Sequence, residues 1–174
     1  VRCCTQNGVR GGSATVHFPI WHQEIEDILV LKNNKGTEDN RVRKLDYSIQ
    51  ISKLFYERFI KDADITLFSP NHVPGLYEAF GMPEFDSLYL KYEKDKSIPK
   101  QTIGAQELFQ ALLKERAETG RIYIMNLDHC NTHSSFKDKI YMSNLCQEIT
   151  LPTTPIQHID DKEGEIALCI LSAI

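Results

Sequence analysis

The chain has 174 residues, 41% of them hydrophobic, which is enough for one domain with a buried core. Its 20 basic and 24 acidic residues give a net charge of −4 without a long basic run, which argues against a nucleic-acid-binding groove. No apolar stretch approaches the length of a membrane span, and the first residues lack a signal-peptide pattern. The five cysteines show no Cys-x-x-Cys spacing, so we expect a reducing, cytoplasmic setting rather than a disulfide scaffold.

Hydrophobic periodicity predicts strands and helices in alternation along the chain. In the first half of the chain the predicted elements are a strand over 13–18, a helix over 19–33, a turn at 33–36, a strand over 45–51, a short helix over 54–62, a strand over 65–68 and short helices over 74–80 and 85–92. In the second half they are a helix over 104–118, a strand over 121–126, a loop or irregular extended piece over 141–151 and an apolar strand over 166–174. Strands separated by helices indicate an α/β architecture, as part of a barrel or a mixed sheet.

Both ends of the chain resemble internal cuts. It opens at Val1 without an initiator methionine and closes in the apolar run 166–174. Because domain ends are usually polar and loosely held, we expect residues 1–174 to be a single segment of a larger domain. A naturally short, buried C-terminal strand is the alternative.

The first candidate site is the sequence Asn144-Leu145-Cys146-Gln147-Glu148. In an extended segment, residues two apart share a face, so the amide, thiol and carboxylate side chains would project together. Such a trio supplies a hydrogen-bonding group, a sulfur centre and a general base for one small polar substrate. On the pattern alone, a structural cysteine between surface polar residues is the favoured interpretation.

Cys169 and the His129-Cys130-x-x-His133 sequence are further candidates. A cysteine in an apolar strand usually serves packing, and Cys169 could form a reversible disulfide only with a second thiol lying opposite. The histidine pair lacks a fourth ligand at a suitable spacing, so we expect a satisfied polar loop there and no metal site.

The opening loop, from Cys4 to Gly12, places glycines on both sides of Arg10. Glycines let backbone amides approach a nucleotide or phosphate closely, and a guanidinium can bind the same anion. An ordinary flexible turn is the plainer alternative for such a loop.

A series of collinear motifs resembles class I ribonucleotide reductase large subunits of the bacterial and T4-like phage type. They cover nearly the whole chain and occur in the family's order, at 4–12, 29–36, 40–43, 67–70, 73–77, 119–124, 128–133, 143–149 and 164–169. The resemblance implies a partial ten-stranded α/β barrel, built from two half-barrels, with a finger loop entering its centre. It also implies that the N-terminal regulatory region and the C-terminal barrel part lie outside this segment, so the isolated chain should be inactive.

The resemblance assigns roles to four residues of the expected reaction centre. Asn144, Cys146 and Glu148 would lie on the finger loop. Cys146 would be the thiyl radical that removes the ribose 3′ hydrogen, Glu148 the base at the 3′ hydroxyl, and Asn144 the group that holds the substrate hydroxyls. Cys169 would be one of two cysteines that reduce the substrate and become a disulfide.

The opening loop would match the family's specificity loop, with Gln6 and Arg10 passing the identity of an effector nucleotide to the substrate base. Cys4, Gly8 and Gly11 belong to the same loop. The family's effectors are deoxynucleoside triphosphates and ATP. The segment itself would bind no cofactor, because a metal-containing small subunit supplies the radical.

The partners implied are the remaining large-subunit segments, the small subunit, the nucleotide substrate and thioredoxin or glutaredoxin as reductant; no membrane or nucleic acid is implied. A non-catalytic remnant, or an assembly fragment that at most binds nucleotide, is the alternative from another class. A segment of an adenosylcobalamin-dependent reductase is the alternative enzyme. The intact set Arg10, Asn144, Cys146, Glu148 and Cys169 favours the class I reductase, because a drifting remnant should have lost some of these residues.

Overall fold

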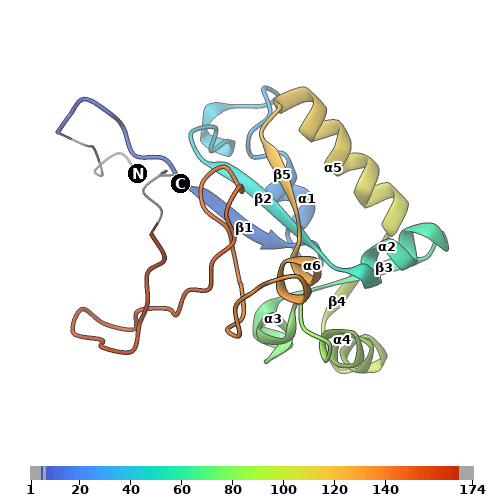
Figure 1. Ribbon diagram of the computed structural model, residues 1–174. Helices are drawn as coiled ribbons and strands as arrows, with labels where there is room; N and C mark the ends of the chain where they lie inside the picture. The colour runs from blue at the N-terminus through green and yellow to red at the C-terminus, as the bar shows by residue number, and fades with distance from the viewer. Residues whose placement is uncertain (1–4, 6, 169–174) are drawn as a thin grey trace.

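The computed structural model describes residue 5 and residues 7–168, and it shows two open sheets with helices packed on them (Figure 1). One sheet is parallel and has the order β1-β2-β5. Its strands are β1 (Thr15–Pro19), β2 (Asp46–Ile51) and β5 (Ile122–Asn126). The other is an antiparallel pair of β3 (Asp64–Phe68) and β4 (Lys100–Gly104).

Helices cover the apolar face of the parallel sheet and the antiparallel pair of β3 and β4. They are α1 (Ile25–Leu29), α2 (Lys53–Ile60), α3 (Leu76–Ala79), α4 (Phe85–Lys94), α5 (Ala105–Thr119) and α6 (Leu127–Thr132), with 3₁₀ helices at Glu38–Asn40 and Pro70–His72. Ile49 and Ile51 of β2 are fully buried in one core cluster with Leu108 and Leu112 of α5. In the described part of the chain, no helix is long and apolar enough to cross a membrane.

The register of the parallel sheet places polar side chains on the face away from α5. His17 pairs with Ser48 and Ser48 pairs with Tyr123, so these three residues form one row across the strands. Side chains two apart on a strand share a face, so Gln50 lies beside Ser48. Ser48 and Gln50 are both fully buried, because the loop 141–149 covers them.

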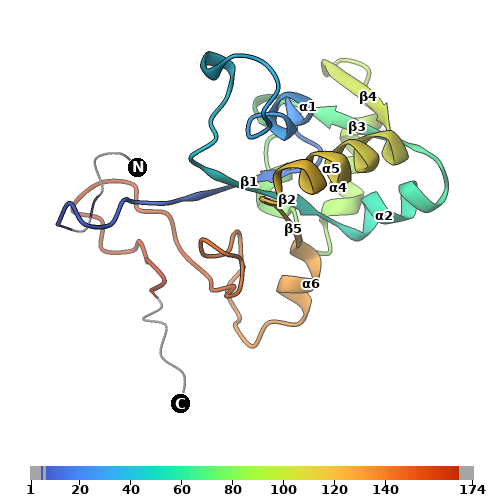
Figure 2. The same cartoon turned by 90° about the horizontal axis from the view of Figure 1, so that it is seen from above.

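The segments at the two ends of the chain extend away from the helical part. In both views, residues 7–14 and the C-terminal segment after about residue 150 lie on the side of the sheet opposite α2 (Figures 1 and 2). The opening loop and the C-terminal segment are therefore on the same side of the molecule.

The α/β class and most of the predicted elements are confirmed, including the helix over 104–118, which is α5, and the loop over 141–151. The helix predicted over 19–33 is wrong apart from α1. Pro19 ends β1 instead, and the next residues pair with strands: Ile20 donates its N–H to Gln50 O (2.9 Å) and Phe68 donates to Trp21 O (2.8 Å). Those strand partners offer backbone hydrogen bonds that compete with a helix.

Three further predictions need correction. The strand β4 and the helix α6 were not predicted, so His129 and His133 lie in or next to a helix rather than in a polar loop. Residues 166–168 of the predicted C-terminal strand have no strand structure, and none of the strands that the structure describes pairs with them. Residues 169–174 lie outside the described residues.

Candidate active site

The loop 141–151 lies on the polar face of the parallel sheet and is fastened there by side chains. Gln147 makes two of the bonds: its Oε1 accepts from the Ser48 hydroxyl (2.6 Å), and its Nε2 donates to the Ile124 carbonyl (2.6 Å). The Thr15 hydroxyl donates to the carbonyl of Leu145. The loop is therefore attached to all three strands of the sheet, on both sides of Cys146.

The start of the loop is held by Gln50 of β2. Its Nε2 donates to the carbonyl of Tyr141, and its side chain is fully buried beneath the loop. A buried amide costs free energy unless it is hydrogen-bonded; this bond satisfies Gln50 Nε2, whereas Gln50 Oε1 has no hydrogen-bond partner among the described residues.

The tip of the loop is a closed turn. The Gln147 N–H donates to the Asn144 carbonyl (3.2 Å), and the Ile149 N–H donates to Asn144 Oδ1 (3.0 Å). Gln147 has the left-handed φ of 62°. The premise that 144–148 is extended is therefore wrong, and strand alternation does not place Asn144, Cys146 and Glu148 on one face.

The three loop residues differ in exposure and in partners. Asn144 is half-buried, whereas Cys146 and Glu148 are exposed. Asn144 Oδ1 is used by the loop, and among the described residues its Nδ2 has no hydrogen-bond partner. The Cys146 thiol lies near the phenol of Tyr123 on β5, and the pKa of Tyr123 is raised by burial and then by this thiol. The exposed thiol and carboxylate are accessible to a ligand.

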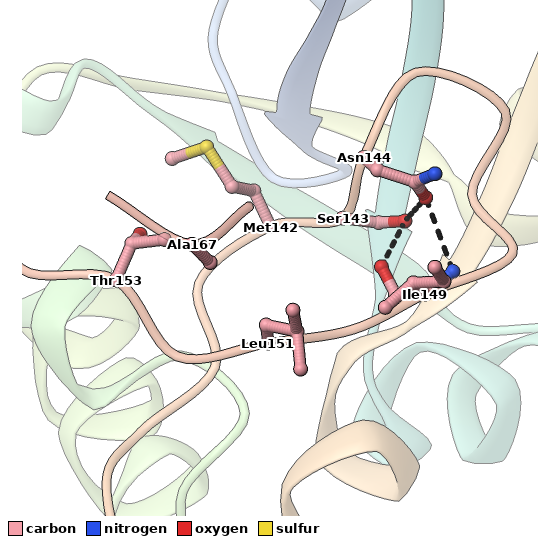
Figure 3. A pocket seen from close by; sticks show the side chains of 7 residues that line it. All are labelled: Met142, Ser143, Asn144, Ile149, Leu151, Thr153 and Ala167. Atoms are coloured by element: carbon pink, nitrogen blue, oxygen red, sulfur yellow. Dashed lines mark hydrogen bonds between the residues drawn. The ribbon is translucent and has the colours of Figure 1, made fainter. Parts of the chain in front are cut away.

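A hollow of about 220 Å³ lies at the base of the loop (Figure 3). Ser143, Asn144 and Ile149 line one side of it, and the C-terminal segment lines the other with Ala167. The Asn144 Nδ2 points away from Ala167 in this view. The loop and the segment that leads to Cys169 therefore border one hollow, although Cys169 itself lies outside the described residues.

The opening loop is described only in part, since Cys4 and Gln6 lie outside the described residues. Gly8, Arg10 and Gly11 are exposed, and Gly8 has the left-handed φ of 72°. Glycine adopts this backbone conformation at little cost, which explains the residue type at that position. Arg10 is accessible to an anionic ligand.

Apart from Gln147, the residues that sequence reasoning missed lie beneath the loop rather than on it. Ser48 and Gln50 alternate with apolar residues in β2, and a buried strand with polar residues on one face was the available signal. His17 lies in the same row as Ser48. Burial lowers the pKa of His17, and this effect outweighs the opposite effect of the Ser143 backbone. His17 should therefore be neutral at pH 7.

The α6 histidines form a contact with each other. The His129 and His133 rings lie 5.5 Å apart in an edge-to-face arrangement, and His133 Nδ1 lies 3.1 Å from the His129 carbonyl. Burial raises the pKa of the intervening Cys130 thiol, with a further contribution from Asp128. In the described part of the chain, no group of three His, Cys, Asp or Glu residues is arranged to hold a metal ion.

Comparison with known proteins places this arrangement in a family. The family model described as the ribonucleotide reductase barrel domain matches residues 1–174. The chain is 60% identical to ribonucleoside-diphosphate reductase subunit alpha of Haemophilus influenzae, over 99% of the chain and 24% of that protein. It is 60% identical to ribonucleoside-diphosphate reductase 1 subunit alpha of Escherichia coli, over 90% of the chain and 21% of that protein. The subunit alpha of phage T4 is 48% identical over 99% of the chain and 23% of its own length.

These relatives agree with the resemblance seen in the motifs. The chain spans about a quarter of the length of the curated relatives it matches. The family model and the identities cover the loop 141–151 and the strands to which it is fastened. The chain belongs to the ribonucleotide reductase family, as a segment of its barrel domain.

Proposed function

We propose that this chain is the segment of a ribonucleoside-diphosphate reductase large subunit that carries the radical-bearing thiol, Cys146, on a finger loop inside a ten-stranded α/β barrel. One observation carries the proposal. The loop with Asn144, Cys146 and Glu148 is fastened over the polar face of a parallel sheet, with its thiol and carboxylate exposed. A polar face is the side of a sheet that can border a substrate cavity rather than a core.

In this proposal Cys146 begins the reaction. A small subunit containing a metal supplies the oxidising equivalent that makes the Cys146 sulfur a thiyl radical. The sulfur takes the 3′ hydrogen atom, so that an S–H bond forms, the C3′–H bond breaks and a ribose radical remains. Glu148 accepts the proton of the 3′ hydroxyl as a general base. Asn144 donates a hydrogen bond to a substrate hydroxyl through Nδ2, because its Oδ1 is already used by the loop.

Reduction then requires a dithiol, which Cys169 forms with a second cysteine from another part of the large subunit. The 2′ hydroxyl leaves as water with one hydrogen of the dithiol, C2′ takes the other hydrogen in its place, and the two sulfurs form a disulfide. Cys146 then returns its hydrogen atom to C3′, and Glu148 returns the proton to the 3′ oxygen. Thioredoxin or glutaredoxin would restore the dithiol by thiol–disulfide exchange. The shared hollow of Asn144 and Ala167 supports this role, since it brings the segment leading to Cys169 next to the finger loop.

The opening loop would act as the specificity loop of the assembled subunit. Gln6 and Arg10 would relay the identity of an ATP or deoxynucleotide effector, with Cys4, Gly8 and Gly11 shaping the loop. Support comes from the exposure of Arg10 and from the left-handed Gly8. The opening loop also lies on the same side of the molecule as the C-terminal segment (Figures 1 and 2).

The test uses a chimera in which residues 1–174 replace the matching segment of the H. influenzae large subunit, assayed with that organism's small subunit. Cys146→Ser should abolish turnover and leave substrate binding nearly unchanged. A serine O–H bond is too strong to exchange reversibly for a ribose C–H bond, although the hydroxyl is close in size to the thiol. Cys169→Ser should block reduction while release of tritium from 3′-labelled substrate persists.

The outcomes separate the alternatives. Deoxynucleotide formation by the Cys146→Ser chimera would contradict the radical role. A chimera with the natural sequence that binds nucleotide but forms no deoxynucleotide would support a non-catalytic remnant instead. Loss of tritium release in the Cys169→Ser chimera would place Cys169 in the radical step rather than in reduction.

A further inference from the structure

We propose that Gln147 is a positioning residue that fixes the Cys146 thiol over the sheet, through its bonds to Ser48 and to the Ile124 carbonyl. This inference rests on the proposed function of Cys146. It concerns a residue that has no chemical role in that function and that the sequence pattern did not single out.

The side chain of Cys146 does not by itself fix the position of its sulfur. Its side chain is exposed, so it has little packing of its own to define where the sulfur lies. A reacting group must nevertheless be held close to its target, and a misplacement of about 1 Å is enough to cost on the order of 100-fold in rate. Apart from the Tyr123 phenol beside it, the position of the thiol must therefore come from the residues on either side.

Both neighbours of Cys146 are fastened to the sheet. On one side the Leu145 carbonyl accepts a bond from Thr15 of β1. On the other side the Gln147 carboxamide uses both of its ends, accepting from Ser48 of β2 and donating to Ile124 of β5 at 2.6 Å each. Because the two ends of the Gln147 carboxamide are bonded to separate strands, the side chain has one allowed orientation, and this orientation fixes the position of the Gln147 backbone.

The backbone of Gln147 shows why a side-chain anchor is needed. Its φ of 62° lies in the left-handed region, which residues with a Cβ occupy unfavourably. The same residue donates its N–H to the Asn144 carbonyl, which closes the turn around Cys146. The two side-chain bonds offset the unfavourable conformation, so losing them should loosen the turn.

The partners of Gln147 also depend on it. Ser48 is fully buried, and its hydroxyl donates to Gln147 rather than to solvent. Without Gln147, the hydroxyl would lose this acceptor beneath the loop, and a buried polar group without a partner destabilises its surroundings. The anchor and the closed turn should therefore be lost together.

The experiment uses the chimera of the proposed function with four variants. Gln147→Leu removes both bonds at similar size. Gln147→Asn keeps an amide that tolerates a left-handed backbone but is too short to span both partners. Ser48→Ala removes one partner, and the double variant Gln147→Leu/Ser48→Ala tests whether the two residues act as a pair. Asp62→Leu is the matched control, because Asp62 has a left-handed φ of 51° on the exposed surface.

We expect Gln147→Leu and Gln147→Asn to slow deoxynucleotide formation by about 10- to 100-fold, with KM changed by less than about threefold, because the thiol is misplaced while the substrate site remains. Ser48→Ala should have a smaller effect, and the double variant should be no slower than Gln147→Leu alone. Hydrogen exchange should accelerate at the Gln147 and Ile149 amides. Asp62→Leu should leave all of these values unchanged.

Deoxynucleotide formation by Gln147→Leu within twofold of the natural sequence would overturn the inference. Full activity of Gln147→Asn would show that backbone conformation, rather than the two bonds, is what matters, and would overturn it as well. An additive double variant would contradict the pairing with Ser48. Failure of the proposed function is distinguishable, since it would appear as turnover in the Cys146→Ser chimera.

Discussion

The strongest prediction about stability concerns the ion pair between Arg58 of α2 and Glu93 of α4. The guanidinium donates to both oxygens of Glu93, at 2.6 Å each, and the Thr66 hydroxyl donates to the same carboxylate at 2.6 Å. The Arg58 and Glu93 side chains are 15% and 25% exposed. Arg58 also donates to the Asp64 carbonyl (2.7 Å), so it connects two helices to β3.

Replacing Arg58 by Met keeps most of the apolar stem but leaves the Glu93 carboxylate without its charged partner. Removing one member of a fully buried pair costs about 3–5 kcal/mol, and the remaining exposure lets water hydrate Glu93, so we expect a loss of about 2 kcal/mol in the free energy of unfolding. Urea unfolding followed by circular dichroism measures it as the shift in midpoint multiplied by the slope.

The matched control is Lys53→Met on the same helix. Lys53 and Glu57 form a pair at 3.3 Å, but their side chains are 75% and 44% exposed. An exposed pair of this kind contributes only about 0.3–0.5 kcal/mol, so the control should lose little stability. Equal losses in Arg58→Met and Lys53→Met would refute the argument from burial.

The pH dependence of the free energy of unfolding gives an independent check on the role of the Arg58–Glu93 pair. Burial alone raises the pKa of Glu93, but the bonds from Arg58 and Thr66 outweigh burial and lower the pKa below its ordinary value. A lowered carboxylate pKa means that its stabilisation is present above the unfolded pKa, about 4.3, and is lost as the pH falls through the folded value. The gap in stability between the natural sequence and Arg58→Met should therefore narrow below about pH 4. A gap that is constant between pH 7 and pH 3 would contradict the assigned cause.

Three other predictions follow from single sites. Gly81→Ala should cost about 3 kcal/mol in urea unfolding, because a Cβ there would lie 2.7 Å from Leu127 Cγ and the φ is +83°; a loss below about 1 kcal/mol would contradict the packing described. Asn131→Ala should cost about 2 kcal/mol by the same measurement, because the Asn131 amide accepts from the N–H of the buried Ile140 and donates to the carbonyl of the same residue. Asn131→Asp should recover little of this stability, because a carboxylate cannot donate to the Ile140 carbonyl. Amides of residues 7–12 should exchange within seconds in the isolated chain, since this stretch is largely exposed, and strong protection there would contradict its position outside the core.

The local sequence pattern predicted those helices and strands whose own residues favour the observed structure. The helix α5 has apolar residues at helical spacing and ends at Gly120, whose φ is +66°. The strands β2 and β5 are rich in isoleucine and tyrosine, and both contribute buried residues to the core cluster. For these segments the side chains prefer the structure that the rest of the fold also requires.

Local pattern failed where a partner distant in the sequence decides the structure. The strand β4 is mostly polar and forms because β3 offers a ladder of backbone hydrogen bonds. The predicted helix after Pro19 is shortened for the same reason, because residues 20–23 pair with β2 and with Phe68 of β3. Intrinsic propensity is a weak preference that such tertiary hydrogen bonds override.

The same division holds for the candidate site. The sequence by itself determined the family resemblance and singled out Asn144, Cys146 and Glu148, because motif order and residue type are properties of the chain alone. Only the tertiary structure decided that these residues lie on a closed turn, fastened through Gln147 to the polar face of a sheet. The reason is physical: the bond between Ser48 and Gln147 joins residues 99 positions apart, and a contact at that separation exists only once the strands and the loop have packed.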